Sequence, residues 1–181
     1  HKLICEEFGE KKISVAANLP YYITTPIITR LLEEKLNIKN IVVMVQKEVA
    51  RRMQAKPSTK DYGAITLLCR YYTKPSIVTD VPAGLFTPPP KVDSAVLKLE
   101  ILPEPSVKVL DEKTFFKTVR AAFSQRRKTL LNCLSASFPI PKEILSQILI
   151  SADIEPSRRG ETLDISEFGA LSDKIFGYIK Q

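Results

Sequence analysis

The chain has 181 residues, 44% of them apolar and 26% charged, which fits a globular protein of one domain or of one domain with a small second one. No stretch approaches the roughly 18 to 20 apolar residues of a membrane span, and no signal peptide is visible. The only histidine is His1, which nearly excludes catalytic triads and histidine-ligated metals. We expect no metal site and no membrane.

The net charge and the cysteines indicate the kind of binding partner and the redox compartment. The net charge of +7 favours a polyanionic partner, most simply a nucleic acid. The three cysteines are scattered and form no C-x-x-C pair, so neither a zinc site nor a disulfide framework is predicted. A reducing compartment is favoured, and we expect a cytoplasmic protein.

The first half of the chain alternates strands and helices. An apolar run predicts a buried strand over residues 13–17, and Thr25 and Pro26 are typical of the N-cap and first turn of a helix that reaches about residue 36. A β-branched run over 41–45 predicts a strand covered on both faces. Further elements are predicted in chain order as helices over 47–56 and 64–72, a strand over 76–81, a proline-rich loop over 82–90 and a strand over 92–101.

This order predicts an α/β fold with a mostly parallel sheet and an antiparallel edge strand. None of the six glycines forms a G-x-G, although a doubly wound sheet that binds a nucleotide-type cofactor normally has a Gly-rich first turn. We therefore expect the chain to start part-way through an α/β domain, as its C-terminal portion.

The composition changes to a linker-like segment over 102–109, and everything after it is predicted to be helical. We expect a boundary near residue 103, which gives a partial α/β domain over 1–103 and a small all-α domain over 104–181. The residues expected to begin the helices are Asp111, Ser124, Pro141 and Ser166.

Asn18-Leu19-Pro20-Tyr21 follows the first strand and suits the methylation of an adenine amine. That amine is a poor nucleophile until acceptors take its two hydrogens, and an Asn side chain and a backbone carbonyl can do this. Pro20 stiffens the turn, and Tyr21 offers a face on which a base can stack. The alternative is an ordinary turn that ends a strand.

A second candidate element spans Phe86 to Ser94. Phe86 could press on the base opposite Tyr21, and Lys91 could meet a phosphate. The alternatives are that Phe86 is a core residue beside prolines that end a strand, or that the prolines form a polyproline recognition site.

Groups of Lys and Arg side chains are the third candidate element. They favour RNA as a binding partner over the alternative that these side chains only face solvent. The residues that we expect to bind RNA are Lys47, Arg51, Lys91, Arg120, Arg126, Arg127, Lys128, Arg158 and Arg159.

With these motifs in this order, the chain closely resembles the small-subunit (16S) ribosomal RNA adenine N6,N6-dimethyltransferases, the bacterial kasugamycin-sensitivity enzymes. The resemblance covers essentially the whole chain. It rests on Asn18-Leu19-Pro20-Tyr21, Thr25-Pro26, Gln46-Lys47-Glu48-Val49, Tyr62-Gly63, Phe86 to Val96, Ala122 to Leu130, Arg158 to Glu161 and the helix start at Ser166–Phe168.

The resemblance implies a Rossmann-like class I methyltransferase sheet followed by helices that bind rRNA. It implies methyl transfer from S-adenosylmethionine to the N6 amines of two adjacent adenosines in the 3′-terminal hairpin of small-subunit rRNA. Asn18 would touch both cofactor and target amine, the carbonyl of Leu19 or Pro20 would take the second amine hydrogen, and Tyr21 and Phe86 would hold the adenine. The implied partner is the immature small ribosomal subunit, and we expect a monomer.

The chain departs from the family in one respect, because the family's Gly-rich turn, acidic ribose contact and aspartate near the adenine have no counterpart in it. We therefore expect an N-terminally truncated member that alone binds little S-adenosylmethionine and has little activity. Three alternatives stay open: a non-catalytic ribosome-assembly factor, a large-subunit methyltransferase of the macrolide-resistance type and, ranked last, a DNA adenine methyltransferase.

Overall fold

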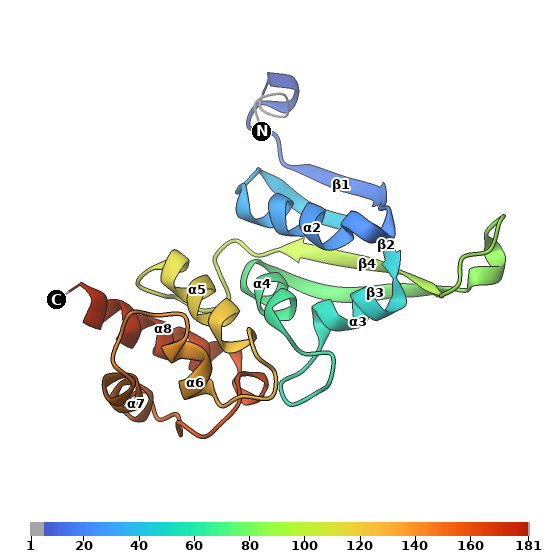
Figure 1. Cartoon of the computed structure of the whole chain (residues 1–181). Helices are drawn as coiled ribbons and strands as arrows, with labels where there is room; N and C mark the ends of the chain where they lie inside the picture. Colours follow the sequence, from blue (N-terminus) through green and yellow to red (C-terminus); the bar gives the residue numbers. More distant parts are fainter. Residues whose placement is uncertain (1–5, 181) are drawn as a thin grey trace. The chain divides into compact units, whose positions relative to one another are not determined.

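The computed structural model describes residues 6–180, so His1 and Cys5 lie outside the described residues. The chain forms two compact units, which Figure 1 traces from blue to red along the sequence. We call them the sheet unit, which comprises His1–Ala55 and Leu68–Ser106, and the helical unit, which comprises Lys56–Leu67 and Val107–Gln181.

The segment 56–67 belongs to the helical unit, whereas the predicted boundary near residue 103 puts it with the sheet. The Tyr62 hydroxyl donates a hydrogen bond to the Leu163 carbonyl oxygen at 2.8 Å. The Tyr62 ring also meets the Phe123 ring edge-on, at a centroid distance of 5.8 Å. These contacts join residues that are 101 and 61 positions apart, which is why the local composition gives no sign of them.

The sheet unit contains a four-stranded sheet in the order β1-β2-β4-β3. β1 pairs in parallel with β2, and β4 pairs antiparallel with both β2 and β3, so β1, β2 and β3 share one direction. The predicted α/β fold and mostly parallel sheet are confirmed, with the reversed strand one place in from the edge. The bounds are Ile13–Asn18 for β1, Ile38–Gln46 for β2, Thr73–Val81 for β3 and Ser94–Ile101 for β4.

The core of the sheet unit is built on β2 and β4. The fully buried apolar residues of these strands are Ile41, Val43, Val45, Ala95, Leu97 and Leu99. Residues on the other face of β2 are half-buried, so this strand is covered on both faces but not equally. The prediction of a buried first strand is wrong, because β1 lies at the sheet edge and its residues alternate between half-buried and exposed.

The helices occupy most of the predicted places. Their bounds are Thr24–Glu33 for α2, Lys47–Gln54 for α3, Ala64–Tyr72 for α4, Glu112–Ala122 for α5, Leu130–Ser135 for α6, Lys142–Ser151 for α7 and Ile165–Ile179 for α8. Short 3-10 turns cover Tyr21–Ile23 (η1), Ala83–Leu85 (η2) and Gly160–Thr162 (η3). No helix in residues 6–180 has the length and apolar character needed to cross a membrane.

Two predicted N-caps agree with the structure. The Asp111 carboxylate accepts hydrogen bonds from the Thr114 hydroxyl and from the Thr114 backbone N–H, both at 2.7 Å, and these two bonds, the hydroxyl first, hold the pKa of Asp111 below its usual value. Pro141 directly precedes α7, as expected.

Three other predicted N-caps are wrong, because a nearby residue accepts the backbone N–H hydrogen bond instead or because a 3-10 turn leads directly into the helix. Thr25 lies inside the first turn of α2, which follows directly on η1. Thr129 caps α6 in place of Ser124, and Asp164 caps α8 in place of Ser166. Asp164 forms a reciprocal capping box with Glu167, which satisfies two backbone donors at once.

The helical unit has its own apolar core. Its largest fully buried side chains are those of Leu67, Phe115, Leu130, Leu134, Leu145, Leu149 and Phe168. Cys69 of the sheet unit and Cys133 of the helical unit are both buried free thiols. Burial raises the pKa of Cys69 to about 12, so its thiol is inert rather than nucleophilic.

Candidate functional site: a pocket at the end of strand β1

Asn18 is the last residue of β1 and presents its amide to solvent. The strand alternates, so Ser14, Ala16 and Asn18 lie on its exposed face. The Leu19 backbone N–H donates to the Met44 carbonyl oxygen at 3.2 Å, which extends the pairing with β2 one residue past the strand. Within the described residues the Asn18 side chain has no hydrogen-bond partner, so its oxygen and NH2 group are free for a ligand.

In the turn after Asn18, the Pro20 carbonyl oxygen accepts hydrogen bonds within the chain and the Leu19 carbonyl oxygen does not. Pro20 has φ −58° and ψ 131°, and its carbonyl oxygen accepts from the Ile23 backbone N–H at 3.2 Å and from the Thr24 hydroxyl at 3.1 Å. A carbonyl oxygen has two lone pairs, so that of Pro20 is fully used. The Leu19 carbonyl has no such partner among the described residues.

Tyr21 is held by a residue that is 73 positions away in the sequence. A 2.7 Å hydrogen bond joins its hydroxyl to Oγ of Ser94, which is fully buried at the start of β4. Ser94 lies in register with Gln46 on one side and Val81 on the other. The orientation of the Tyr21 ring is therefore fixed by the Ser94 hydroxyl on β4, an inner strand of the sheet.

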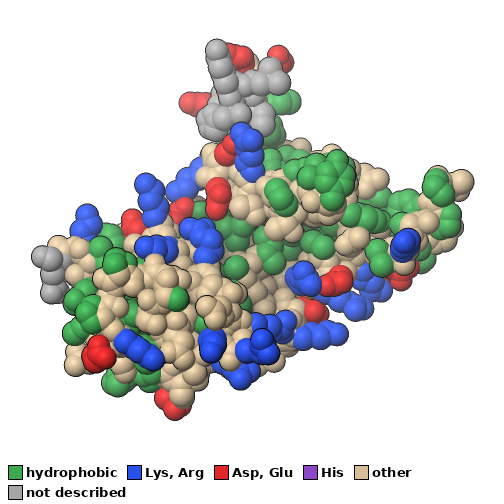
Figure 2. Space-filling model, in the orientation of Figure 1, with side chains coloured by type: hydrophobic (Ala, Val, Ile, Leu, Met, Phe, Trp, Pro, Cys, Tyr) green, Lys and Arg blue, Asp and Glu red, His purple; other side chains and the backbone are tan. Residues whose placement is uncertain are grey.

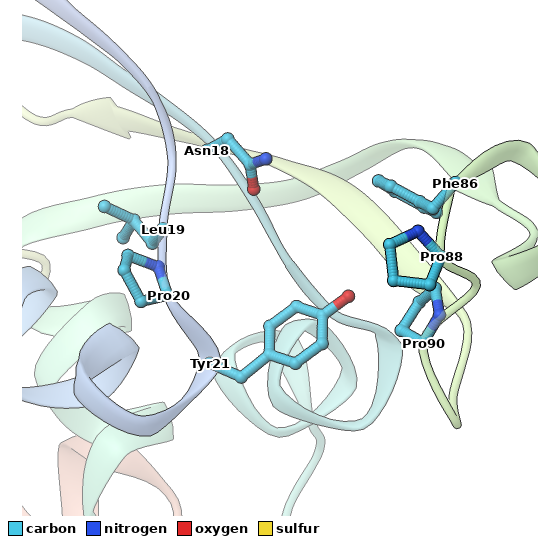
Figure 3. Close-up of a pocket in the computed structure, with 7 residues that line it drawn as sticks. All are labelled: Asn18, Leu19, Pro20, Tyr21, Phe86, Pro88 and Pro90. Carbon is cyan, nitrogen blue, oxygen red and sulfur yellow. The ribbon is translucent and has the colours of Figure 1, made fainter.

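The opposite wall comes from the loop between β3 and β4. Asn18 to Tyr21, Phe86, Pro88 and Pro90 line a pocket of about 330 Å³, at the lower end of the range for small-ligand sites. Figure 3 shows the Asn18 amide and the Tyr21 and Phe86 rings directed toward a common space, whereas the Leu19 and Pro20 side chains point away from it. The peptide bond between Thr87 and Pro88 is cis.

The predicted RNA-binding residues of the sheet unit differ in their surroundings. Lys47 is half-buried and forms an ion pair with Asp80, with Nζ 2.5 Å from a carboxylate oxygen. Arg51 on α3 and Lys91 in the β3–β4 loop are exposed. The charge of Lys47 is therefore already neutralised in part, whereas Arg51 and Lys91 are open to an anionic ligand.

In the helical unit, the cations predicted over 126–128 lie in the turn between α5 and α6 and not on a helix. Arg126 braces this turn, because its guanidinium donates to the Lys60 carbonyl oxygen at 2.8 Å. The Ser58 backbone N–H also donates to the Glu161 carbonyl oxygen at 2.8 Å. Three basic segments far apart in the sequence are thus joined within one unit, and Figure 2 shows Lys and Arg side chains spread over its surface.

The exposed members of this basic group are Lys56, Lys60, Arg126, Arg127, Lys128 and Arg159, with Arg120 exposed at the end of α5. Lys56 and Lys60 are not among the residues predicted to bind RNA, although they belong to a group of cations that favoured RNA as the partner. The only sequence signal for them was charge.

Arg158 has a different role from its neighbour Arg159. Its guanidinium makes a two-pronged contact with the Glu167 carboxylate and also donates to the Thr162 carbonyl oxygen at 2.8 Å. Partial burial tends to raise the pKa of Glu167, but the Arg158 and Asp164 hydrogen bonds outweigh it and lower that pKa. The pair ties the 158–162 turn to the start of α8.

The pocket residues suit a methyl donor only in part. S-adenosylmethionine carries ribose hydroxyls and a charged methionine end, which call for a carboxylate and for backbone amides of a Gly-rich turn. Asn18 has the one polar side chain of the pocket lining without a partner among the described residues, since the Tyr21 hydroxyl is bonded to Ser94 and the other lining side chains are apolar. No cluster of three His, Cys, Asp or Glu side chains suited to a metal occurs in the described part of the chain.

The sheet is that of Rossmann-like ribosomal RNA methyltransferases. A dimethyladenosine transferase from Plasmodium falciparum superposes with a TM-score of 0.74 at 26% identity, covering 99% of this chain and 77% of that one. The 23S rRNA methyltransferase ErmE gives a TM-score of 0.64 at 22% identity, covering 92% of this chain and 66% of that one, which supports the fold alone.

The family follows from the sequence comparison. The model of the family described as ribosomal RNA adenine dimethylase matches residues 6–171, and the chain belongs to this family. Proteins named ribosomal RNA small subunit methyltransferase A are 50% identical in Alkaliphilus oremlandii and 54% identical in Clostridium perfringens, over 97% and 94% of this chain. The chain spans about three fifths of the length of these curated relatives, 61% and 59% respectively.

Proposed function

We propose that this chain forms the methyl-acceptor half of an enzyme that dimethylates adenine N6 amines in small-subunit ribosomal RNA. The observation that carries the proposal is the pairing of the free Asn18 amide and the free Leu19 carbonyl in one pocket with two aromatic rings. Such a pocket offers two acceptors for the two hydrogens of one amine and two faces for one base.

The amine would be activated without an acid or a base. The Asn18 side-chain oxygen accepts one N–H of the adenine amine and the Leu19 carbonyl accepts the other. Of the two carbonyls that the sequence left open, that of Leu19 is favoured, because the Pro20 oxygen already has two donors. With both hydrogens held, the nitrogen lone pair is turned out of the ring and becomes nucleophilic. As the nitrogen bonds to the methyl carbon, the donor's sulfur would keep the electron pair of the broken bond and one amine proton would pass to water.

Tyr21 and Phe86 would hold the adenine by stacking, which contributes about 1–3 kcal/mol per base. The buried Ser94 hydroxyl fixes the Tyr21 ring, so little conformational freedom is lost when the base enters. Positioning of this kind is the main contribution that we assign to the chain in the reaction.

S-adenosylmethionine, when bound, supplies an electrophilic methyl group. Asn18 is the residue of this chain that we assign to its side of the pocket, and the lack of other suitable groups there supports weak binding by the 181 residues alone. Calorimetric titration of this chain with S-adenosylmethionine should give no micromolar binding, and a micromolar Kd would overturn this part of the proposal.

The exposed cations of the helical unit and Arg51 and Lys91 of the sheet unit would bind RNA phosphates. Arg158 is given a structural role because Glu167 and Thr162 already occupy its donors, and Lys47 is the weaker candidate because of Asp80. The partner would be the immature small ribosomal subunit, which sets the location in the cytoplasm, and a monomer suffices for this function.

The names of the relatives support the small subunit over the large one as substrate. The test is methyl transfer from labelled S-adenosylmethionine to purified small and large subunits that lack adenine dimethylation, using the full-length gene product that contains these residues. We expect two adjacent dimethylated adenosines in small-subunit rRNA. Labelling of the large subunit instead would support the macrolide-resistance type, and binding to the small subunit without labelling would support a non-catalytic assembly factor.

A further inference from the structure

The loop between β3 and β4 is unusually stiff for a segment without regular structure. Four of its residues are prolines, at 82, 88, 89 and 90. Within η2 the Leu85 and Phe86 backbone N–H groups donate to the carbonyls of Pro82 and Ala83, at 3.1 and 3.2 Å. The Asp93 carboxylate accepts from the Ala83 backbone N–H at 3.0 Å, so the two ends of the loop are tied together. The loop is therefore pre-formed.

This stiff loop carries one large apolar side chain, that of Leu85, which is mostly exposed to solvent. Leu85 is 75% exposed, and Val92 farther along the loop is 45% exposed. Figure 2 shows hydrophobic side chains at the tip of this loop, where it projects from the sheet unit. Leu85 directly precedes Phe86, which lines the pocket, so the exposed side chain is carried by the residue next to the pocket wall.

A base that enters this pocket must leave its stack, and an apolar side chain that fills the space it vacates lowers the cost of unstacking. A leucine on a stiff support can do this with little loss of its own freedom. We propose that Leu85 is such a wedge: it inserts into the RNA base stack beside the target adenosine while that adenosine occupies the pocket. This inference rests on the proposed function, because it takes the occupant of the pocket to be an adenine.

The surroundings of Leu85 favour RNA over a protein surface as its partner. Lys91 in the same loop is exposed, and a cation next to an apolar tip suits a strand whose bases stack and whose phosphates are charged. The loop also carries the pocket residues Pro88 and Pro90, so a nucleic acid whose base enters the pocket contacts this loop.

The test compares two RNAs of the same target sequence by fluorescence anisotropy with the 181-residue chain. One is a stem–loop in which the target adenosines are stacked, and the other is an unstructured single strand of the same target sequence, in which no stack has to be opened or filled. Leu85→Ala should weaken binding of the stacked RNA about tenfold and leave binding of the unstructured RNA within about twofold. Leu85→Met, which keeps a long apolar side chain, should restore binding.

Val78→Ala is the matched control, since Val78 is 60% exposed on β3 outside the loop and the pocket. It should leave both affinities unchanged. Equal losses for the two RNAs in Leu85→Ala, or no loss for either, would overturn the wedge while leaving the proposed function standing. A wild-type chain that binds neither RNA would overturn the proposed function and the wedge together.

Discussion

The hydrogen bond between Tyr21 and Ser94 leads to a prediction about which partner is worse to lose. Ser94 is fully buried, and the Tyr21 hydroxyl is the only hydrogen-bond partner of its side chain within residues 6–180, whereas Tyr21 itself is half-buried and can reach water. Tyr21→Phe therefore leaves a buried hydroxyl unsatisfied, which costs about 1–3 kcal/mol. Ser94→Ala removes the buried group together with the bond, which costs about 0.5–1.5 kcal/mol.

The double variant tests whether these costs belong to one interaction. Tyr21→Phe combined with Ser94→Ala should be about as stable as Ser94→Ala alone, because no buried hydroxyl is left without a partner. Urea unfolding of the 181-residue chain, followed by far-UV circular dichroism, gives the free energies of unfolding. Additive losses, or a smaller loss for Tyr21→Phe than for Ser94→Ala, would refute the reasoning.

Three further outcomes follow from the helical unit. Gly160→Ala should destabilise the chain by about 1–3 kcal/mol, because the new Cβ would lie 2.7 Å from the Ala122 carbonyl oxygen. Gly177→Ala is the control and should not destabilise the chain, because the new Cβ would have no atom within 4 Å. Thermal unfolding compares the two variants, and equal effects would argue against tight packing at Gly160. Since the pKa of Glu167 is lower in the folded chain, its contribution to stability should be complete above about pH 4.5 and lost as the pH falls through the lower folded value, and Glu167→Gln should flatten that part of the stability–pH curve. Arg127→Ala should weaken RNA binding and reduce the salt slope by about 0.7–0.9 without changing stability, and an unchanged slope in anisotropy titrations would remove Arg127 from the phosphate contacts.

The local part of the pocket could be predicted from the sequence. Asn18 to Tyr21 are consecutive, and the chemistry of an amide, a carbonyl and a ring after a strand is visible without a fold. Phe86 could be named because three prolines mark its loop. What brings Phe86 to Asn18 is the return of β4 beside β2, which is a property of the sheet.

The partners that hold the site could not be predicted, because each comes from a distant segment. The hydroxyl of Ser94 lies 73 residues from Tyr21, and the carboxylate that occupies Arg158 lies on the next helix. Charge alone makes Arg158 and Arg159 equivalent, and only the folded chain separates the paired arginine from the exposed one.

The edge position of β1 is a tertiary property as well. An apolar run such as Ile13–Ala17 is equally compatible with a central strand and with a strand that has one neighbour. The helix starts were misplaced for a local reason, since several Ser, Thr and Asp residues stand close together and only one makes the cap.

The most direct test of the central claim is the effect of Asn18→Ala on the full-length gene product, measured as the methyl-transfer rate constant at saturating S-adenosylmethionine together with the affinity for small subunits. Because the side-chain oxygen acts on the amine and not on the RNA backbone, the rate constant should fall about 10²- to 10³-fold while the affinity stays within about twofold. An unchanged rate constant, or equal losses in rate and affinity, would contradict the assignment of Asn18 to the adenine amine.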